Sequence, residues 1–225
     1  MIEMKEAPDT SARHVSLSVS DLDAVYALHL AATGAVGRPE LIKPESRDFF
    51  ARILSGGGRI MGVMRGDALV AYGVLQLELP PSEDARPLLG LSPADRLAKL
   101  AGAAVLPQAW GGGIHDDLIH LRVEDARRIG VGHLYATSAP GNFRSWPNLV
   151  EAGFAVRAIV EKYGGHLRYI LYRDLAAAEP RDADGVWCGV EDIERQRSLI
   201  AAGCVGARWR KRADGGRDLW YRAAA

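Results

Sequence analysis

Three consecutive glycines, Gly111 to Gly113, separate an apolar segment from a helical pattern, and this junction constrains the fold more than any other feature of the chain. The apolar segment ends at Val105-Leu106-Pro107, and apolar residues recur at helical spacing from Ile114 to Ile129. A glycine run lets the backbone approach a ligand closely, because no Cβ atom intervenes. The first N–H groups of a helix have no intrahelical partner, and together with the helix dipole they bind anions. A strand, a glycine loop and a helix in this order therefore predict a bound phosphate or pyrophosphate.

Two common phosphate motifs do not fit this loop. A P-loop requires Lys and then Ser or Thr after its last glycine, whereas Ile114 and His115 follow Gly113. A dinucleotide fingerprint lies in the first strand–helix turn and is followed by an acidic residue at the end of the next strand. Here the loop lies near the middle of the chain, and the next strand ends in Thr137-Ser138-Ala139-Pro140. A different phosphate ligand is expected.

The junction resembles the acetyl-CoA-binding motif of the GCN5-related N-acetyltransferases (GNAT). That family typically has a strand ending in Val-x-Pro, then Arg or Gln, Gly, any residue, Gly, any residue, and Gly or Ala. When the motif is aligned on Val105 and Pro107, Trp110 takes the position of the basic or amide residue, and His115 takes the position of the small residue. A second register, starting at Gln108, breaks the spacing from the proline. The cofactor-binding residues that the resemblance implies are Val105, Leu106, Trp110, Gly111, Gly112, Gly113, Ile114 and His115. For His115 two readings stay open, a phosphate ligand when protonated or a polar surface residue.

A second segment, Asn142 to Phe154, resembles the family's Asn-x-x-Ala/Ser pattern that closes with Gly-Phe. The resemblance implies that Asn142 contacts the pantetheine arm. Ser145 suits the N-cap of a short helix and Gly153 suits its C-terminal cap. The family's tyrosine general acid lies seven residues after the Asn, where this chain has Leu149. Ser145 is then the nearest hydroxyl for protonating a leaving thiolate, with water and a purely capping role as the alternatives.

The acceptor amine must lose a proton before it attacks, so a base or a water chain is needed. Glu78, at the end of an apolar segment, is the candidate base, and a solvated glutamate is the alternative. Four further residues are candidates for lining an acceptor pocket, with packing as the alternative: Tyr135, Tyr163, His166 and Arg168. We expect no metal site.

The order of elements predicts an α/β (α+β) sandwich with a mixed, mostly antiparallel sheet flanked by helices, which is the GNAT layout. We expect a leader at 1–14, an acyltransferase domain at 15–175 and a C-terminal helix-plus-hairpin extension at 176–225. The expected strands are 15–19, 60–64, 69–77, 100–106, 133–137, 155–160 and 167–172. The expected helices are 20–34, 45–54, 114–129 and 190–202, followed by a hairpin at 204–221 and preceded by a linker at 176–185.

Composition narrows the class of partner. The chain has 225 residues with 28 basic and 28 acidic side chains, so no overall charge draws it to nucleic acid or an anionic membrane. Arginines interleaved with aromatics at 208–222 form a basic–aromatic cluster, which we interpret as a hairpin face, with a nucleic-acid surface or a dimer contact as alternatives. Cys188 and Cys204 form no CxxC pair, and no apolar signal or membrane segment is present. We expect a cytoplasmic protein, with homodimerisation open.

These features together predict an acetyl-CoA-dependent N-acetyltransferase that acetylates a small-molecule amine by direct attack in a ternary complex and releases CoA. Two alternatives remain, because several motif positions are substituted and because the sequences of the loops that would bind the acceptor do not identify it. One is a catalytically silent CoA-binding or regulatory module, and the other is a protein (lysine or N-terminal) acetyltransferase.

Overall fold

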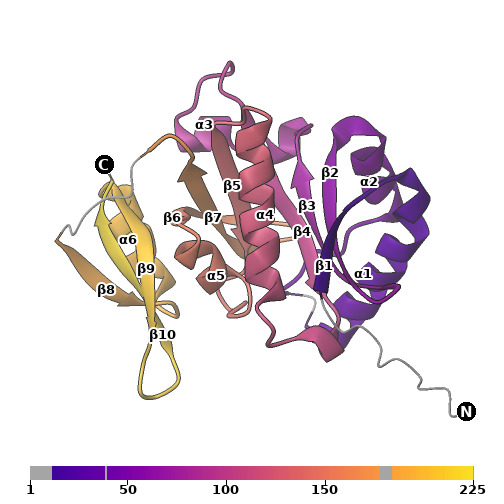
Figure 1. The fold of residues 1–225 in the computed structure, drawn as a ribbon. Coiled ribbons are helices and arrows are strands. Elements are labelled where there is room, and N and C mark those ends of the chain that lie inside the picture. The colour runs from indigo at the N-terminus through magenta and orange to yellow at the C-terminus, as the bar shows by residue number, and fades with distance from the viewer. Residues whose placement is uncertain (1–11, 39, 178–183, 225) are drawn as a thin grey trace, which may run out of the picture.

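The computed structural model describes residues 12–38, 40–177 and 184–224 (Figure 1). Its strands are β1 (Ala12–Leu17), β2 (Gly58–Arg65), β3 (Ala68–Gln76), β4 (Leu97–Val105), β5 (His133–Ser138), β6 (Ala155–Lys162), β7 (His166–Asp174), β8 (Gly185–Gly189), β9 (Cys204–Lys211) and β10 (Arg217–Ala223). Its α-helices are α1 (Leu22–Val36), α2 (Arg47–Arg52), α3 (Arg86–Leu89), α4 (Ile114–Arg128), α5 (Trp146–Glu151) and α6 (Ile193–Ala201). None of the helices within these ranges has the length and apolar content needed to cross a membrane.

All ten strands join in one sheet in the order β1-β2-β3-β4-β5-β7-β6-β9-β10-β8. The pairing of β4 with β5 is parallel, and the other pairings are antiparallel. The parallel pair is joined through α4, as a crossover connection requires. The predicted mixed, mostly antiparallel sheet with flanking helices is confirmed.

Helices cover both faces of the sheet. Along β3 successive side chains point to opposite faces, so its residues sort by face. Tyr72 and Val74 pack in one apolar cluster with α1 and α2. Ala71 packs with the first turns of α4, and Leu75 packs with the rest of α4 and with α5. The centre of the sheet, where the parallel strands meet, is therefore enclosed between two helical layers.

Glycines end and begin the helices around this centre where the sequence predicts them. Gly113 is the N-cap of α4 with φ 73°, and Gly130 follows its last turn with φ 73°. Gly153 follows α5 with φ 81°. These left-handed conformations favour glycine because a Cβ atom would be strained there. Ser145 occupies the N-cap position of α5, but its side chain makes no capping hydrogen bond, so the predicted cap is only positional.

The N-terminal region differs from the prediction at three places. Residues 12–14 belong to β1 and not to a leader, whose remaining residues 1–11 lie outside the described ranges. The first helix does not begin at residue 20, because Ser20 lies inside a short 3₁₀ turn whose N-cap is Ser18, and α1 starts at Leu22. Helix α1 continues past Gly34 to Val36 and ends at Gly37, whose φ is 62°. One glycine inside a helix costs only about 1 kcal/mol, which packing of the apolar face outweighs.

The C-terminal extension continues the central sheet. Strand β9 pairs with β6 at Val156 and Gly206, and β8 forms the far edge beside β10 (Figure 1). The sequence pattern missed β8, because it has five residues and a glycine at each end. Its Trp187 lies opposite Trp220 on β10, with ring centroids 5.1 Å apart. Most of the predicted linker, 178–183, lies outside the described residues.

Candidate active site

The two parallel strands separate halfway along their length. β4 and β5 pair from Leu97 opposite His133 to Leu100 opposite Ala136, and the pairing extends no further. At the same level β4 contains one extra residue relative to β3, because Gly73 pairs with Ala103 whereas Leu75 pairs with Leu100. This bulge falls at residues 101–102, and bulges bend and re-aim a strand. The β5-facing backbone edge of residues 101–105 is thereby left without a neighbouring strand.

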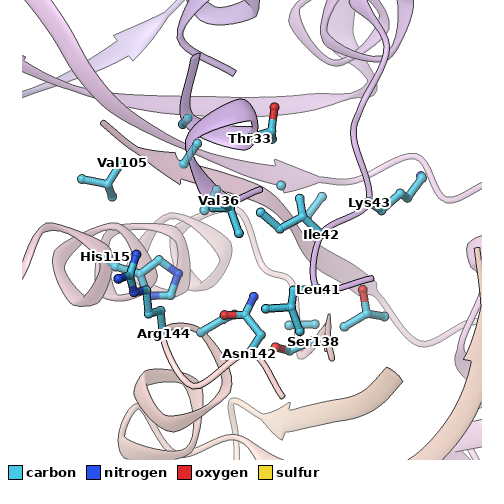
Figure 2. A pocket seen from close by; sticks show the side chains of 18 of the residues that line it. Thr33, Val36, Leu41, Ile42, Lys43, Val105, His115, Ser138, Asn142 and Arg144 are labelled. Carbon is cyan, nitrogen blue, oxygen red and sulfur yellow. The ribbon is translucent and has the colours of Figure 1, made fainter. Parts of the chain in front are cut away.

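A cavity of about 590 Å³ opens where the strands separate. Its walls come from the second half of β4, the end of α1, the segment 41–45 and the loop 141–145 after β5. Figure 2 shows Leu41 and Ile42 on one side of the opening and Asn142 facing them from the other. A Cβ atom added at Gly141 would lie 3.4 Å from Leu41, so the segment after α1 reaches across to the loop after β5. The cavity is roofed by this crossing segment.

The glycine loop lies at the end of β4 beside the cavity, and all three of its glycines are exposed. Gly111 and Gly113 have φ of 80° and 73°, which turns the chain sharply before α4 begins. A Cβ atom on Gly112 would meet Arg65 Nη2 at 3.6 Å, so a guanidinium from the end of β2 stands beside the loop. The 15-residue helix α4 begins at the same place, and the N–H groups ahead of Asp116, which itself donates to the Gly113 carbonyl, lie at its N-terminus. Amides, a helix N-terminus and an arginine together favour an anion.

Trp110 replaces the usual basic residue of the motif, yet it brings a cation to the same place. Its indole N–H donates to the carbonyl of Val105 at 2.8 Å, which fixes the ring over the strand end. The Arg144 guanidinium lies 4.1 Å from the centre of that ring. A guanidinium over a tryptophan face is a favourable cation–π contact. The positive charge that the motif position lacks is therefore supplied from the loop after β5.

His115 is neutral around pH 7. Burial lowers its pKa to about 4, and the charge of Arg122 acts in the same direction. The Asn148 amide lies 3.2 Å from His115 Nδ1, so Nδ1 accepts and the proton is on Nε2. Figure 2 shows the ring next to Arg144 at the edge of the cavity. Burial thus disfavours the protonated form that the interpretation as a charged phosphate ligand requires, and the half-buried ring is not a simple surface residue either.

Of the remaining residues that were predicted to bind the cofactor, some line the cavity and others do not. Asn142 and Ser145 line the cavity together with Leu149, which is buried at the position of the family tyrosine. Leu106 does not line the cavity, and Ile114 is a core residue beside Val63 and Leu118. For Leu106 and Ile114 only backbone groups remain as candidates for ligand contact.

Glu78 does not reach the cavity. It lies beyond the end of β3, is exposed and is not among the lining residues. Glu45, just before α2, lines the cavity where the sequence analysis expected Glu78. A Cβ atom on Gly102 at the bulge would lie 3.6 Å from the Glu45 side chain. Burial raises the pKa of Glu45, although Lys43 at 3.1 Å opposes the shift. The structure thus gives a carboxylate with increased basicity beside the strand bulge.

A buried histidine holds the backbone of Glu45. The Glu45 N–H donates to His29 Nε2 at 2.9 Å, and His29 Nδ1 is 2.7 Å from the Tyr72 hydroxyl. Because Nε2 accepts, the ring proton is on Nδ1 and is donated to Tyr72. Burial lowers the pKa of His29, which keeps the ring neutral and this tautomer fixed. The carboxylate is positioned by contacts from α1 and β3.

A second buried group of charges lies next to Glu45, because Lys43 contacts both Glu45, at 3.1 Å, and Glu83, at 3.9 Å. Lys99 on β4 is paired with Glu83 at 2.7 Å and donates to the Tyr163 hydroxyl at 3.2 Å. Tyr163 and Arg168 line the cavity, as the sequence suggested, whereas Tyr135 and His166 do not. The Tyr135 hydroxyl instead donates to the Glu83 carbonyl.

Solved structures with the same architecture are N-acetyltransferases. The ribosomal-protein-S18-alanine N-acetyltransferase from Escherichia coli aligns with a TM-score of 0.57 at 17% identity over 77% of this chain and 100% of its own. This chain has the GNAT fold. A Salmonella typhimurium protein, YncA, solved with its cofactor acetyl-CoA, aligns with a TM-score of 0.56 at 16% identity, over 77% of this chain and 99% of its own. The Thermoplasma acidophilum PaiA N-acetyltransferase, solved in complex with coenzyme A, aligns with a TM-score of 0.52 at 14% identity, over 73% of this chain and 99% of its own. Neither a protein-family model nor a curated protein matches the sequence.

Within this GNAT fold, sequence reasoning missed several buried charges. Lys99 interrupts an apolar strand, and Arg122 falls on the apolar face of α4, four residues after Leu118. A charge on an otherwise apolar face was the available signal, because charged residues are rarely fully buried without a role. Arg122 Nε donates to the Leu118 carbonyl at 2.8 Å, and its Nη1 reaches the Ala101 carbonyl at 3.4 Å. It therefore supports the strand bulge. Nothing in the sequence marked Glu45.

Proposed function

We propose that the protein is an acyl-CoA-dependent N-acyltransferase that transfers an acetyl group from acetyl-CoA to the amine of a small molecule. The observation that carries this proposal is the separation of β4 from β5 at the β4 bulge, opening into a cavity beside the glycine loop. An extended ligand laid in that gap meets a free strand edge along its length and an anion-binding loop at its end.

The residues present fit a CoA thioester. The amides at Gly112, Gly113 and the start of α4, with Arg65 and Arg144 on either side, would hold the pyrophosphate. The open backbone edge of residues 101–105 and the side chain of Asn142 would hold the pantetheine amides. When bound, acetyl-CoA supplies an activated acetyl group on a good leaving group.

Glu45 is the proposed base. An acceptor amine arrives protonated at neutral pH, and the lone pair must be freed before it can attack a carbonyl. Glu45 stands beside the bulge with a raised pKa, which makes the carboxylate a better proton acceptor than an exposed glutamate. The backbone amides at the bulge are the proposed donors to the carbonyl oxygen as charge develops on it. Ser145, whose hydroxyl lines the cavity, or a water is the proposed proton donor to the departing thiolate.

The roof of the cavity favours a small acceptor over a protein. The segment 41–45 lines the cavity, and Leu41 meets the loop after β5 near Gly141, which narrows the access to the bulge. The buried Leu149, at the position of the family tyrosine, is the observation that favours a catalytically silent CoA-binding module as the second candidate.

Calorimetric titration with acetyl-CoA, CoA and a longer acyl-CoA tests the cofactor assignment, and CoA-thiol release with an amine panel tests turnover. We expect saturable micromolar binding of acetyl-CoA and amine-dependent thiol release. Tight binding with no release for any amine would favour the silent module. No binding of any of the three ligands would refute the proposal.

A further inference from the structure

Arg168, on β7, carries a buried guanidinium edge without a partner. The residue is 3% exposed, and it lines the cavity. Its Nη1 donates to the Leu167 carbonyl at 2.8 Å, whereas its buried Nη2 has no hydrogen-bond partner among the described residues. Burial lowers the pKa of Arg168, which reflects the cost of removing this charge from water, and none of the ion pairs in the described part of the chain includes it. A buried unpaired charge is strongly unfavourable unless a ligand satisfies it.

Positive charge exceeds negative charge around this part of the cavity. Four cations lie within 6 Å of the Tyr163 ring centre: Lys43 at 4.9 Å, Lys99 at 5.8 Å, Lys162 at 5.7 Å and Arg168 at 5.6 Å. Two carboxylates face them, since Glu45 pairs with Lys43, and Glu83 pairs with Lys99 and Lys162. The lysines share these two carboxylates, and Arg168 has none. The local field therefore favours a ligand with a negative group at Arg168.

Tyr163 is held in a strained conformation beside this charge. With a φ of 55° it is the one non-glycine residue of the described ranges with positive φ, which is unusual for a bulky side chain. The conformation turns the β6–β7 connection so that the ring lies against Arg168 and the hydroxyl meets Lys99 at 3.2 Å. Strain of this kind persists only where the surroundings enforce it, and it concentrates at functional sites. The Tyr163 ring, held in this conformation, limits the directions in which the free edge of the Arg168 guanidinium can point.

We infer that the acceptor is an amine that also carries a carboxylate, and that Arg168 binds this carboxylate. The inference rests on the proposed function. The same cavity has the Glu45 carboxylate beside the bulge and the Arg168 guanidinium on β7. A zwitterionic acceptor places its ammonium group toward Glu45 and its carboxylate toward Arg168, so each end meets the opposite charge. A single free edge matches one carboxylate, whereas a doubly charged phosphate would call for additional unpaired cations.

Two parallel measurements separate this inference from the proposed function. The first is binding, by saturation-transfer NMR in the presence of CoA, of the common amino acids, their carboxamides and phosphoethanolamine. The second is CoA-thiol release from acetyl-CoA with the same compounds. Both are run on the wild type, Arg168→Gln, Arg168→Lys and Arg157→Gln. Arg157 is a matched control, because its guanidinium also lies over a tyrosine ring, 5.3 Å from the Tyr172 ring centre, and it does not line the cavity.

For at least one amino acid we expect binding and turnover that exceed those of its carboxamide. Arg168→Gln should raise the KM of that amino acid by about 30-fold or more, because one partner of a buried charge pair is removed. Arg168→Lys should recover part of the loss, and the carboxamide and the acetyl-CoA affinity should not respond. Arg157→Gln should behave as the wild type. A merely structural role for Arg168 would lower the melting temperature and affect both acceptors equally.

The contrary outcomes are distinct. Turnover of amines with no preference for a carboxylate, or stronger binding of phosphoethanolamine, overturns the inference and leaves the transferase intact. Arg168-dependent binding of amino acids without thiol release overturns the transferase and leaves the carboxylate site. Absence of binding by every amino acid, or equal binding by Arg168→Gln, also overturns the inference.

Discussion

Replacing Gly112 by aspartate tests whether the glycine loop is an anion site. The position tolerates a side chain, because its φ is not in the left-handed region and an added Cβ atom would meet only Arg65 Nη2 at 3.6 Å and the Ala109 carbonyl at 3.8 Å. The new carboxylate would stand beside Arg65 and pair with it in the free protein. We therefore expect no loss of stability, in contrast to substitution at Gly111 or Gly113, where φ is positive.

The substitution is instead expected to weaken the binding of CoA. Two unit charges about 4 Å apart repel by about 1 kcal/mol in water and about 4 kcal/mol at the effective dielectric constant near a protein surface, about 20. Since about 1.4 kcal/mol corresponds to a tenfold change in Kd, CoA binding to Gly112→Asp should weaken by about 5-fold to 1,000-fold. Capture of Arg65 by the new aspartate acts in the same direction.

Calorimetry with acetyl-CoA on wild type, Gly112→Asp, Gly112→Asn and Gly112→Ala provides the assay. Asparagine has the same shape without the charge, so the Asp-to-Asn difference isolates electrostatics from bulk. That difference should shrink in about 1 M NaCl, where the screening length is about 3 Å, relative to about 0.1 M, where it is about 10 Å. A Kd for the aspartate variant within about threefold of the asparagine variant at low salt would refute the assignment of the loop to the pyrophosphate.

Three further perturbations follow from the site. Glu45→Gln should lower kcat by about 100-fold or more and remove the acid limb of the pH–rate profile, because the proposed base is lost. Burial raises the pKa of Glu45, so the folded state holds this proton more tightly than the unfolded state, and wild-type stability should fall relative to Glu45→Gln as pH rises through that pKa. Trp110→Ala should weaken CoA binding by about two- to fivefold, the worth of an exposed cation–π contact with Arg144. Gly73→Ala should cost about 1–3 kcal/mol of unfolding free energy in urea, because its Cβ atom would lie 2.8 Å from Arg122 Nε.

Each of these expectations has a control. An unchanged acid limb in Glu45→Gln would exclude Glu45 as the titrating base, and Glu78→Gln, at an exposed residue outside the cavity, should leave kcat as in the wild type. A double-mutant cycle of Trp110→Ala with Arg144→Ala should be non-additive, and additive losses in affinity would show that the two residues act separately. Gly34→Ala, with no atom within 4 Å of the added Cβ, should stabilise α1 by about 0.5–1 kcal/mol, and a Gly73→Ala effect no larger than this would contradict the packing argument.

The fold was largely predictable because its signals are local. Apolar segments bounded by turn residues predicted β2, β3 and β7, and glycines predicted the ends of α4 and α5, since both signals depend only on neighbouring residues. The errors came where packing overrides local preference. Gly34 stays helical because α1 is buried against β3, and β8 exists because β10 offers it an edge and Trp220 offers a partner for Trp187.

The same distinction between local signals and tertiary packing applies to the candidate site. The chain order by itself predicted the candidate anion loop, because a strand, three glycines and a helix in succession place backbone amides close together. Only the tertiary structure decided the charges around the cavity. Arg144 stands over Trp110, and Glu45 replaces Glu78 as the candidate base. Arg168 Nη2 is buried without a hydrogen-bond partner among the described residues. Each of these features depends on how segments far apart in the chain pack together. Burial and pairing set the cost and the pKa of a charge, and neither is a property of the residue's sequence neighbours.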